Sequence, residues 1–113
     1  MEGTIKKYDV EARVVELLKT VFDPEMPVDI YEMGLIYKID VKETDDSEKP
    51  FDVDIDMTLT APNCPAADYI MEDVQQKLDS IEAVRNANVN LVFEPEWTKD
   101  MMSEEAKLDL GLI

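Results

Sequence analysis

The stretch Phe51–Thr60, which reads FDVDIDMTLT, decides the fold of this chain. Apolar and polar side chains alternate through it, and successive side chains of a β-strand point to opposite faces of the sheet. The alternation therefore predicts a strand over 51–59 with one buried face. The other face carries a row of three carboxylates, from Asp52, Asp54 and Asp56. We expect this polar face to be turned to solvent or to a partner.

A calcium site on this row is the less favoured interpretation. Along an extended strand the three acids lie about 6.5–7 Å apart, which is too far for them to close around one ion unaided. Lys38 and Lys42, on the strand expected to face them, would offset their charge. We therefore expect a solvated acidic face.

The segments around this strand have equally regular patterns. Before it, helical spacing of apolar residues predicts a helix over 9–22 with Asp9 as its N-cap, and alternation predicts a strand over 35–42. Two prolines between them exclude a regular helix, and Val28 and Ile30 are expected to anchor that segment to the core. After it, we expect a helix that Pro65 opens and that runs to Ile81, a strand over 83–93 with Phe93 turned inward, and a short helix from a Ser103 cap to Leu110.

This order predicts an α/β fold of the α+β kind, α-β-β-α-β, in a single domain over 1–113. The sheet is expected to be three-stranded and mixed, with both main helices on one face and a short C-terminal helix. We expect the strand order 2-1-3, which places the 35–42 strand in the centre. Residues 1–8 are expected to be disordered, and 94–113 to form a tail.

Composition excludes several classes of function. The net charge of the 113 residues is −16, from 27 acidic and 11 basic side chains, so nucleic acid and membrane surfaces are not expected partners. There is no histidine, which removes Ser-His-Asp and Cys-His catalysis. With one cysteine and no apolar segment for a bilayer or a signal peptide, we expect a cytoplasmic protein that is not an enzyme.

Cys64 is the residue on which function is expected to depend. It lies between Pro62 and Pro65, immediately before the second helix, where unpaired backbone N–H groups and the helix dipole favour thiolate over thiol. Asp68 opposes this effect. Local physics leaves two interpretations open, a reactive thiol and a buried cysteine that acts as a small hydrophobe. One thiol cannot supply the four ligands of a cluster.

Three separated motifs resemble the MIP18 family, also called the DUF59 or PaaD-like domain, and within it the stand-alone bacterial SufT-like factors. The motifs are Asp23-Pro24-Glu25 with Pro27-Val28, Met33–Tyr37, and Thr58-Leu59-Thr60 with Cys64-Pro65; the ending Trp97–Ala106 with Leu110-Gly111 is similar as well. The resemblance implies the iron–sulfur-assembly fold, with Cys64 as the reactive residue. It also implies Asp23, Glu25, Thr58 and Thr60 as further functional residues.

The resulting hypothesis is an accessory factor in iron–sulfur cluster assembly. Cys64 would bind iron or a cluster transiently, sharing it with a partner, a second subunit, a small thiol or the carboxylates of Asp23 and Glu25, and no tightly bound cofactor is expected. The implied partners are the assembly machinery and client apoproteins, and a homodimer that pairs two Cys64 thiols stays open.

Two alternatives remain beside this hypothesis. One is an adaptor that recruits client apoproteins without touching metal. The other is a PaaD-like accessory protein of an oxygenase complex, although the chain lacks the extra cysteines of that type. An enzyme with a thiolate nucleophile ranks last, because no general base is evident.

Overall fold

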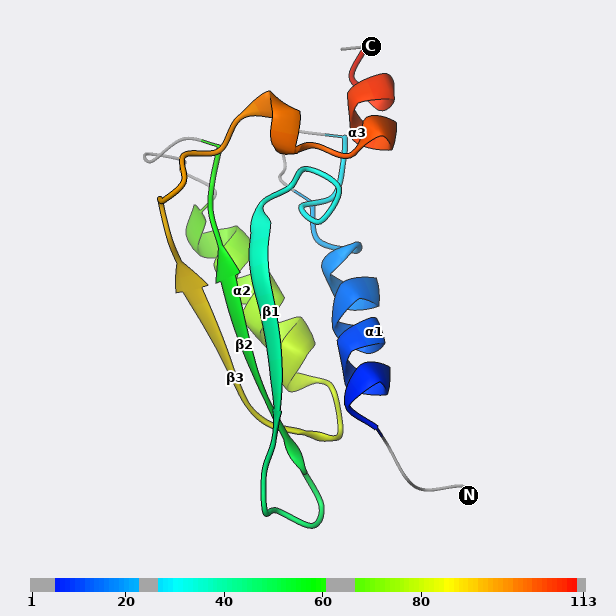
Figure 1. Cartoon of the computed structure of the whole chain (residues 1–113), viewed down its shortest axis with the longest axis vertical. Helices are drawn as coiled ribbons and strands as arrows, with labels where there is room; N and C mark the ends of the chain where they lie inside the picture. Colours follow the sequence, from blue (N-terminus) through cyan, green and yellow to red (C-terminus); the bar gives the residue numbers. More distant parts are fainter. Residues whose placement is uncertain (1–5, 23–26, 61–66, 112–113) are drawn as a thin grey trace.

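The computed structural model describes residues 6–22, 27–60 and 67–111. Figure 1 shows a three-stranded sheet, and α1 and α2 pack against each other on one face of it. The elements are α1 (Lys7–Leu18), β1 (Ile36–Glu43), β2 (Phe51–Met57), α2 (Ala67–Asp79), β3 (Val84–Leu91), a short 3-10 helix η1 (Lys99–Met101) and α3 (Glu104–Asp109). The expected α-β-β-α-β order and short C-terminal helix are therefore confirmed.

The sheet has the order β1-β2-β3, so the expected central position of the first strand is wrong. β1 pairs antiparallel with β2, and β3 pairs parallel with the other edge of β2. The crossover through α2 returns the chain directly beside β2, as a strand–helix–strand connection usually does. Side chains support this pairing as well, because the amides of Asn88 and Asn90 donate to Asp54 (3.1 Å) and Asp56 (3.2 Å).

The core lies between the sheet and the two helices, and it contains the side chains that the alternation predicts. Val53, Ile55 and Met57 of β2 are fully buried. The apolar face of α2 is buried as well, through Ile70, Val74 and Leu78. The two residues expected to anchor the segment before β1, Val28 and Ile30, are also buried. Phe93 is an exception: it is 47% exposed, because β3 ends at Leu91, two residues before it.

α1 is shifted towards the N-terminus relative to the predicted helix over 9–22. Its N-cap is Lys6, and Asp9 sits inside the first turn, where its carboxylate accepts the Lys6 backbone N–H at 3.0 Å. Lys7 and Tyr8 are helical, so the expectation of disorder does not hold for them. The helix ends at Leu18, because the chain then turns so that the carbonyl of Val21 accepts the N–H of Ile30 at 2.9 Å. None of the helices described is long and apolar enough to cross a membrane.

The polar face of β2 is paired with the flanking strands. The Arg85 guanidinium holds Asp52 through two hydrogen bonds, at 2.9 and 3.2 Å. Lys42 lies 3.8 Å from Asp54, as the sequence suggested for a facing lysine. The three acids are therefore bound separately by their neighbours and do not converge on a common point.

The tail after β3 folds back over the turn that precedes β1. Trp97 donates its indole N–H to the carbonyl of Met33 at 2.8 Å, and the N–H of Ser103 reaches the carbonyl of Glu32 at 2.9 Å. Between these contacts Gly34 has a φ of 81°, and a Cβ added there would overlap the carbonyl oxygen of Met101. A residue without a side chain at position 34 is thus required for the tail to lie close to the turn.

Replacing Gly34 by alanine should lower the free energy of unfolding by about 2–3 kcal/mol, because alanine disfavours this φ and displaces Met101. Urea unfolding followed by Trp97 emission measures the change. Gly111→Ala is the matched control, since Gly111 has a φ of 75° and, among the described residues, no atom lies within 4 Å of an added Cβ. The control should lose about 1 kcal/mol. Equal losses in the two variants would contradict the close contact with Met101.

Candidate functional site

The motif residues that the structure describes, in Met33–Tyr37, Thr58–Thr60 and the segment from Trp97, lie at one end of the molecule. Figure 1 shows the C-terminal ends of β2 and β3, the turn before β1 and the segment containing η1 at this end. Backbone hydrogen bonds join these parts, because the N–H of Thr58 donates to the carbonyl of Leu35 and the N–H of Val92 to that of Met57, both at 2.8 Å. The strand ends and the turn thus form one connected support.

Two of the five predicted site residues lie in this region. Thr58 is buried at 1% exposure, whereas Thr60 is exposed, and both line a pocket of about 350 Å³. The other lining residues of this pocket are Leu59, Phe93, Glu94, Glu96 and Trp97. The motif therefore contributes one buried and one accessible hydroxyl to the same pocket.

The remaining predicted residues, Asp23, Glu25 and Cys64, lie outside the described residues. Cys64 follows Thr60 by four positions in the sequence and precedes the start of α2 by three. The segment with Asp23 and Glu25 follows Phe22, which forms an antiparallel bridge with Asp29. The described residues thus show how the flanks of both segments are held, and the meeting of the three side chains stays a prediction.

The phenol of Tyr37 connects the strand ends to the tail. Its hydroxyl donates to the carbonyl of Pro95 at 2.8 Å and lies 3.4 Å from the sulfur of Met101. Partial burial raises the pKa of Tyr37 above its ordinary value of 10.0, and a hydrogen bond with the Thr58 side chain acts in the opposite direction. The phenol consequently stays protonated at neutral pH and remains a donor to the tail.

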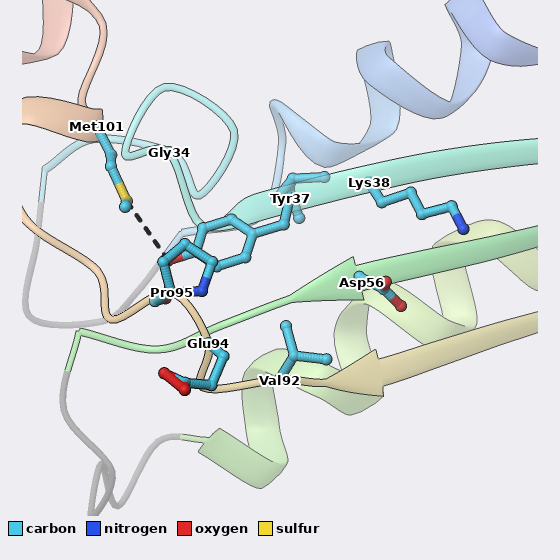
Figure 2. A pocket seen from close by; sticks show the side chains of 9 residues that line it. Gly34, Tyr37, Lys38, Asp56, Val92, Glu94, Pro95 and Met101 are labelled. Carbon is cyan, nitrogen blue, oxygen red and sulfur yellow. Dashed lines mark hydrogen bonds between the residues drawn. The ribbon is translucent and has the colours of Figure 1, made fainter.

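A larger pocket of about 610 Å³ lies beside Tyr37, between the ends of the three strands and the tail. Figure 2 shows the Tyr37 ring reaching from β1 towards Pro95 and Met101, with Lys38 and Asp56 further along the sheet. A neighbouring pocket of about 390 Å³ is also lined by Tyr37 and Met101. Within the described ranges, no group of three or more Cys, Asp or Glu side chains is arranged to hold a metal ion.

Sequence reasoning missed the roles of Tyr37, Pro95 and Met101 in this region. Tyr37 stands inside the Met33–Tyr37 motif that carried the family resemblance, so a signal was present. Pro95 contributes a backbone carbonyl, which no side-chain pattern can mark. Trp97 acts as a clasp for the tail, because its indole N–H donates to the carbonyl of Met33.

Comparison with known proteins identifies the class of domain to which this fold belongs. The family described as "Iron-sulfur cluster assembly protein" matches residues 11–91, and this chain belongs to that family. The resemblance to the DUF59 family is thereby confirmed.

Individual relatives cover nearly the whole chain. A "Fe-S protein maturation auxiliary factor" of Porphyromonas gingivalis is 53% identical over 103 residues, which cover 91% of this chain and 92% of the relative. The "Fe-S protein maturation auxiliary factor SufT" of Staphylococcus aureus is 44% identical over 92 residues, covering 81% of this chain and 98% of the relative. The crystal structure of a DUF59 domain from Bacillus anthracis, 36% identical, superposes with a TM-score of 0.77 and covers 95% of this chain and 96% of that one.

Tyr37→Phe should lower the free energy of unfolding by about 1 kcal/mol near neutral pH, because the carbonyl of Pro95 loses its donor. The pKa of Tyr37 is higher in the folded than in the unfolded state. The stability that its protonated hydroxyl contributes is therefore complete below pH 10 and is lost as the pH rises through the folded-state pKa. Wild type should therefore lose stability more steeply above pH 10 than Tyr37→Phe does. Urea titrations between pH 7 and 11 measure both effects. Tyr8→Phe, at a residue 66% exposed, is the control and should change the neutral-pH stability little. Parallel pH profiles for wild type and Tyr37→Phe would contradict this assignment.

Proposed function

We propose that this chain is a non-enzymatic accessory factor in the maturation of iron–sulfur proteins, with the thiolate of Cys64 holding iron or a cluster in transit. The observation that carries the proposal is the family match over residues 11–91. The names of the relatives, which are Fe-S protein maturation auxiliary factors, support the same role. The proposed partners are the assembly machinery and client apoproteins, in the cytoplasm, where a free thiol stays reduced.

The number of ligands makes the proposed site a shared one. The chain has one cysteine and no histidine, while an iron–sulfur cluster is ordinarily held by four thiolates. The cargo would therefore be held jointly by Cys64 and a second molecule, with Asp23 and Glu25 as further oxygen ligands. A homodimer that pairs two Cys64 thiols is one form of such sharing.

The described residues provide a rigid support for the segment that carries the thiol. Thr60 lies four positions before Cys64 in the sequence. Two positions before Thr60, Thr58 is buried, and its backbone N–H donates to a carbonyl in the turn before β1. Three positions after it, α2 begins and buries Ile70 in the core. We infer that the thiol is presented from between these two anchored flanks.

A pure adaptor that recruits clients without metal is the second candidate. The pockets beside Tyr37 favour it, since about 610 Å³ lined largely by apolar side chains provides a surface for another protein. The two candidates differ in whether the thiol is needed.

Cys64→Ser should abolish the maturation of iron–sulfur enzymes to the level of a strain without the chain, because serine is a poor ligand for iron at neutral pH. Enzyme activities in cells and transfer to an apoprotein in vitro measure this. Thr20→Ser is the matched control, as it makes a comparably small change at an exposed residue that is not among those lining the pockets, and it keeps the thiol. Full maturation with Cys64→Ser would exclude the thiol role, and retained client binding would then favour the adaptor.

Anaerobic reconstitution with Fe²⁺ and sulfide should give wild type a labile visible absorption band that iodoacetamide prevents. Alkylation reports on one site, because Cys64 is the only cysteine. Iron and sulfide analysis of wild type and Cys64→Ser provides the quantitative measurement. Equal iron contents in the two proteins would contradict binding at the thiol.

A further inference from the structure

The pockets at the functional end of the sheet adjoin one another along the tail. Tyr37 and Met101 line both the 610 Å³ and the 390 Å³ pocket, and Glu94 lines both the 610 Å³ and the 350 Å³ pocket. We call this row of pockets the tail groove. It extends from Tyr37 past Glu94 to the Thr58–Thr60 stretch, four positions before Cys64.

The walls of the tail groove are apolar. Tyr37, Val92 and Pro95 line its central part, and Figure 2 shows the Tyr37 ring against Pro95, with Val92 near the end of β3. At the end near Thr60, Phe93 is 47% exposed and contributes an aromatic surface. An accessible aromatic and apolar strip of this kind suits an apolar or aromatic side chain of a partner.

The charge of the tail groove is negative. Four of its lining residues are acidic, namely Glu32, Asp56, Glu94 and Glu96, and Glu32 lies 3.6 Å from the ammonium of Lys19. Lys38 also lines the groove, but it stands opposite Asp56 in the register of the sheet, so the two charges offset each other. The whole chain is acidic as well, with a net charge of −16. A basic segment is therefore the electrostatic complement of this groove.

We propose that the tail groove binds an extended segment of the client protein, in which an apolar or aromatic residue is flanked by lysine or arginine. Its apolar residue lies against Tyr37, Val92 and Pro95, and its basic residues meet Glu94 and Glu96. This inference rests on the proposed function, because the groove ends beside the stretch that leads to Cys64. A segment bound there brings the client to the Thr58–Thr60 stretch, four positions before Cys64 in the sequence.

The binding test uses two synthetic peptides as probes. One is Gly-Lys-Arg-Phe-Lys-Leu-Arg-Gly-Ser, and the other has glutamate at each basic position. Amide chemical shifts of ¹⁵N-labelled protein locate the binding site and yield the affinity, and emission of Trp97, the only tryptophan, gives a second signal. The basic peptide should shift the amides of Tyr37, Val92 and Glu94, and the acidic peptide should leave them unchanged. Shifts centred on α1 or spread over the whole surface would overturn the proposal.

Charge-reversal variants distinguish binding in the tail groove from general attraction of a basic peptide to an acidic protein. Glu94→Lys with Glu96→Lys should weaken binding of the basic peptide by about fivefold or more. Glu72→Lys with Glu82→Lys, at two exposed positions on α2 and the turn after it, changes the net charge equally and should alter the affinity by less than about twofold. Equal weakening by both double variants would show nonspecific attraction and refute the groove. A change of oligomeric mass caused by the groove variant alone would identify a second copy as the occupant, which refutes the proposal as well.

The same variants distinguish failure of the groove from failure of the proposed function. Cys64→Ser should keep its affinity for the basic peptide while maturation is lost, whereas the groove variant should lose affinity and show reduced maturation. Unchanged affinity in the groove variant refutes the groove, whatever Cys64→Ser does. Full maturation with Cys64→Ser refutes the thiol role, and the localised peptide binding then stands by itself.

Discussion

The polar face of β2 depends on partners that the flanking strands supply. Three carboxylates at alternate positions repel one another, and each is held by a neighbouring side chain, Asp52 by Arg85, Asp54 by Asn88 and Lys42, and Asp56 by Asn90. Most of these donors come from β3, so they are in place when β3 lies parallel beside β2 in this register. A slip by one residue would turn the asparagines towards the helices and bury polar amides. The hydrogen bonds and ion pairs of these carboxylates therefore help to fix the order of the strands.

The strand order determines at which end of the sheet the pockets lie. Because β3 runs parallel to β2, the C-terminal ends of both strands lie at the same end of the sheet, and the N–H of Val92 can donate to the carbonyl of Met57. The chain must then begin its tail beside Thr58. It continues across the turn before β1, where Gly34 leaves room for Met101 and Tyr37 donates to Pro95. The pockets thus arise where two strand ends, one turn and the tail are forced together.

Local sequence patterns predicted the helices and strands well, but they did not predict which strands pair with each other. The buried face of β2 and the stripe of α2 follow from periodicity, which needs no knowledge of the rest of the chain. The asparagines Asn86, Asn88 and Asn90 of β3 stand opposite the three aspartates of β2 in the observed register, but the expected strand order did not take this complementarity into account and was wrong for that reason. Thr58 and Thr60, which the family motif predicts as functional residues, line one of the pockets, and their roles stay predictions. The bond from Tyr37 to Pro95 spans 58 residues and has no periodic signature, so sequence could not reveal it.

A chain with a single thiol is suited to passing a cluster on rather than to keeping it. A chain with a full set of thiolates would retain a cluster, because every ligand would have to leave before the cargo could pass on. With one cysteine, the cargo in the proposed role is always bound in part by another molecule, and transfer requires fewer bonds to exchange at each step. Selectivity must then come from surfaces outside the metal site. Carboxylates beside exposed apolar side chains can provide it, since charge steers the encounter while apolar contact retains the partner.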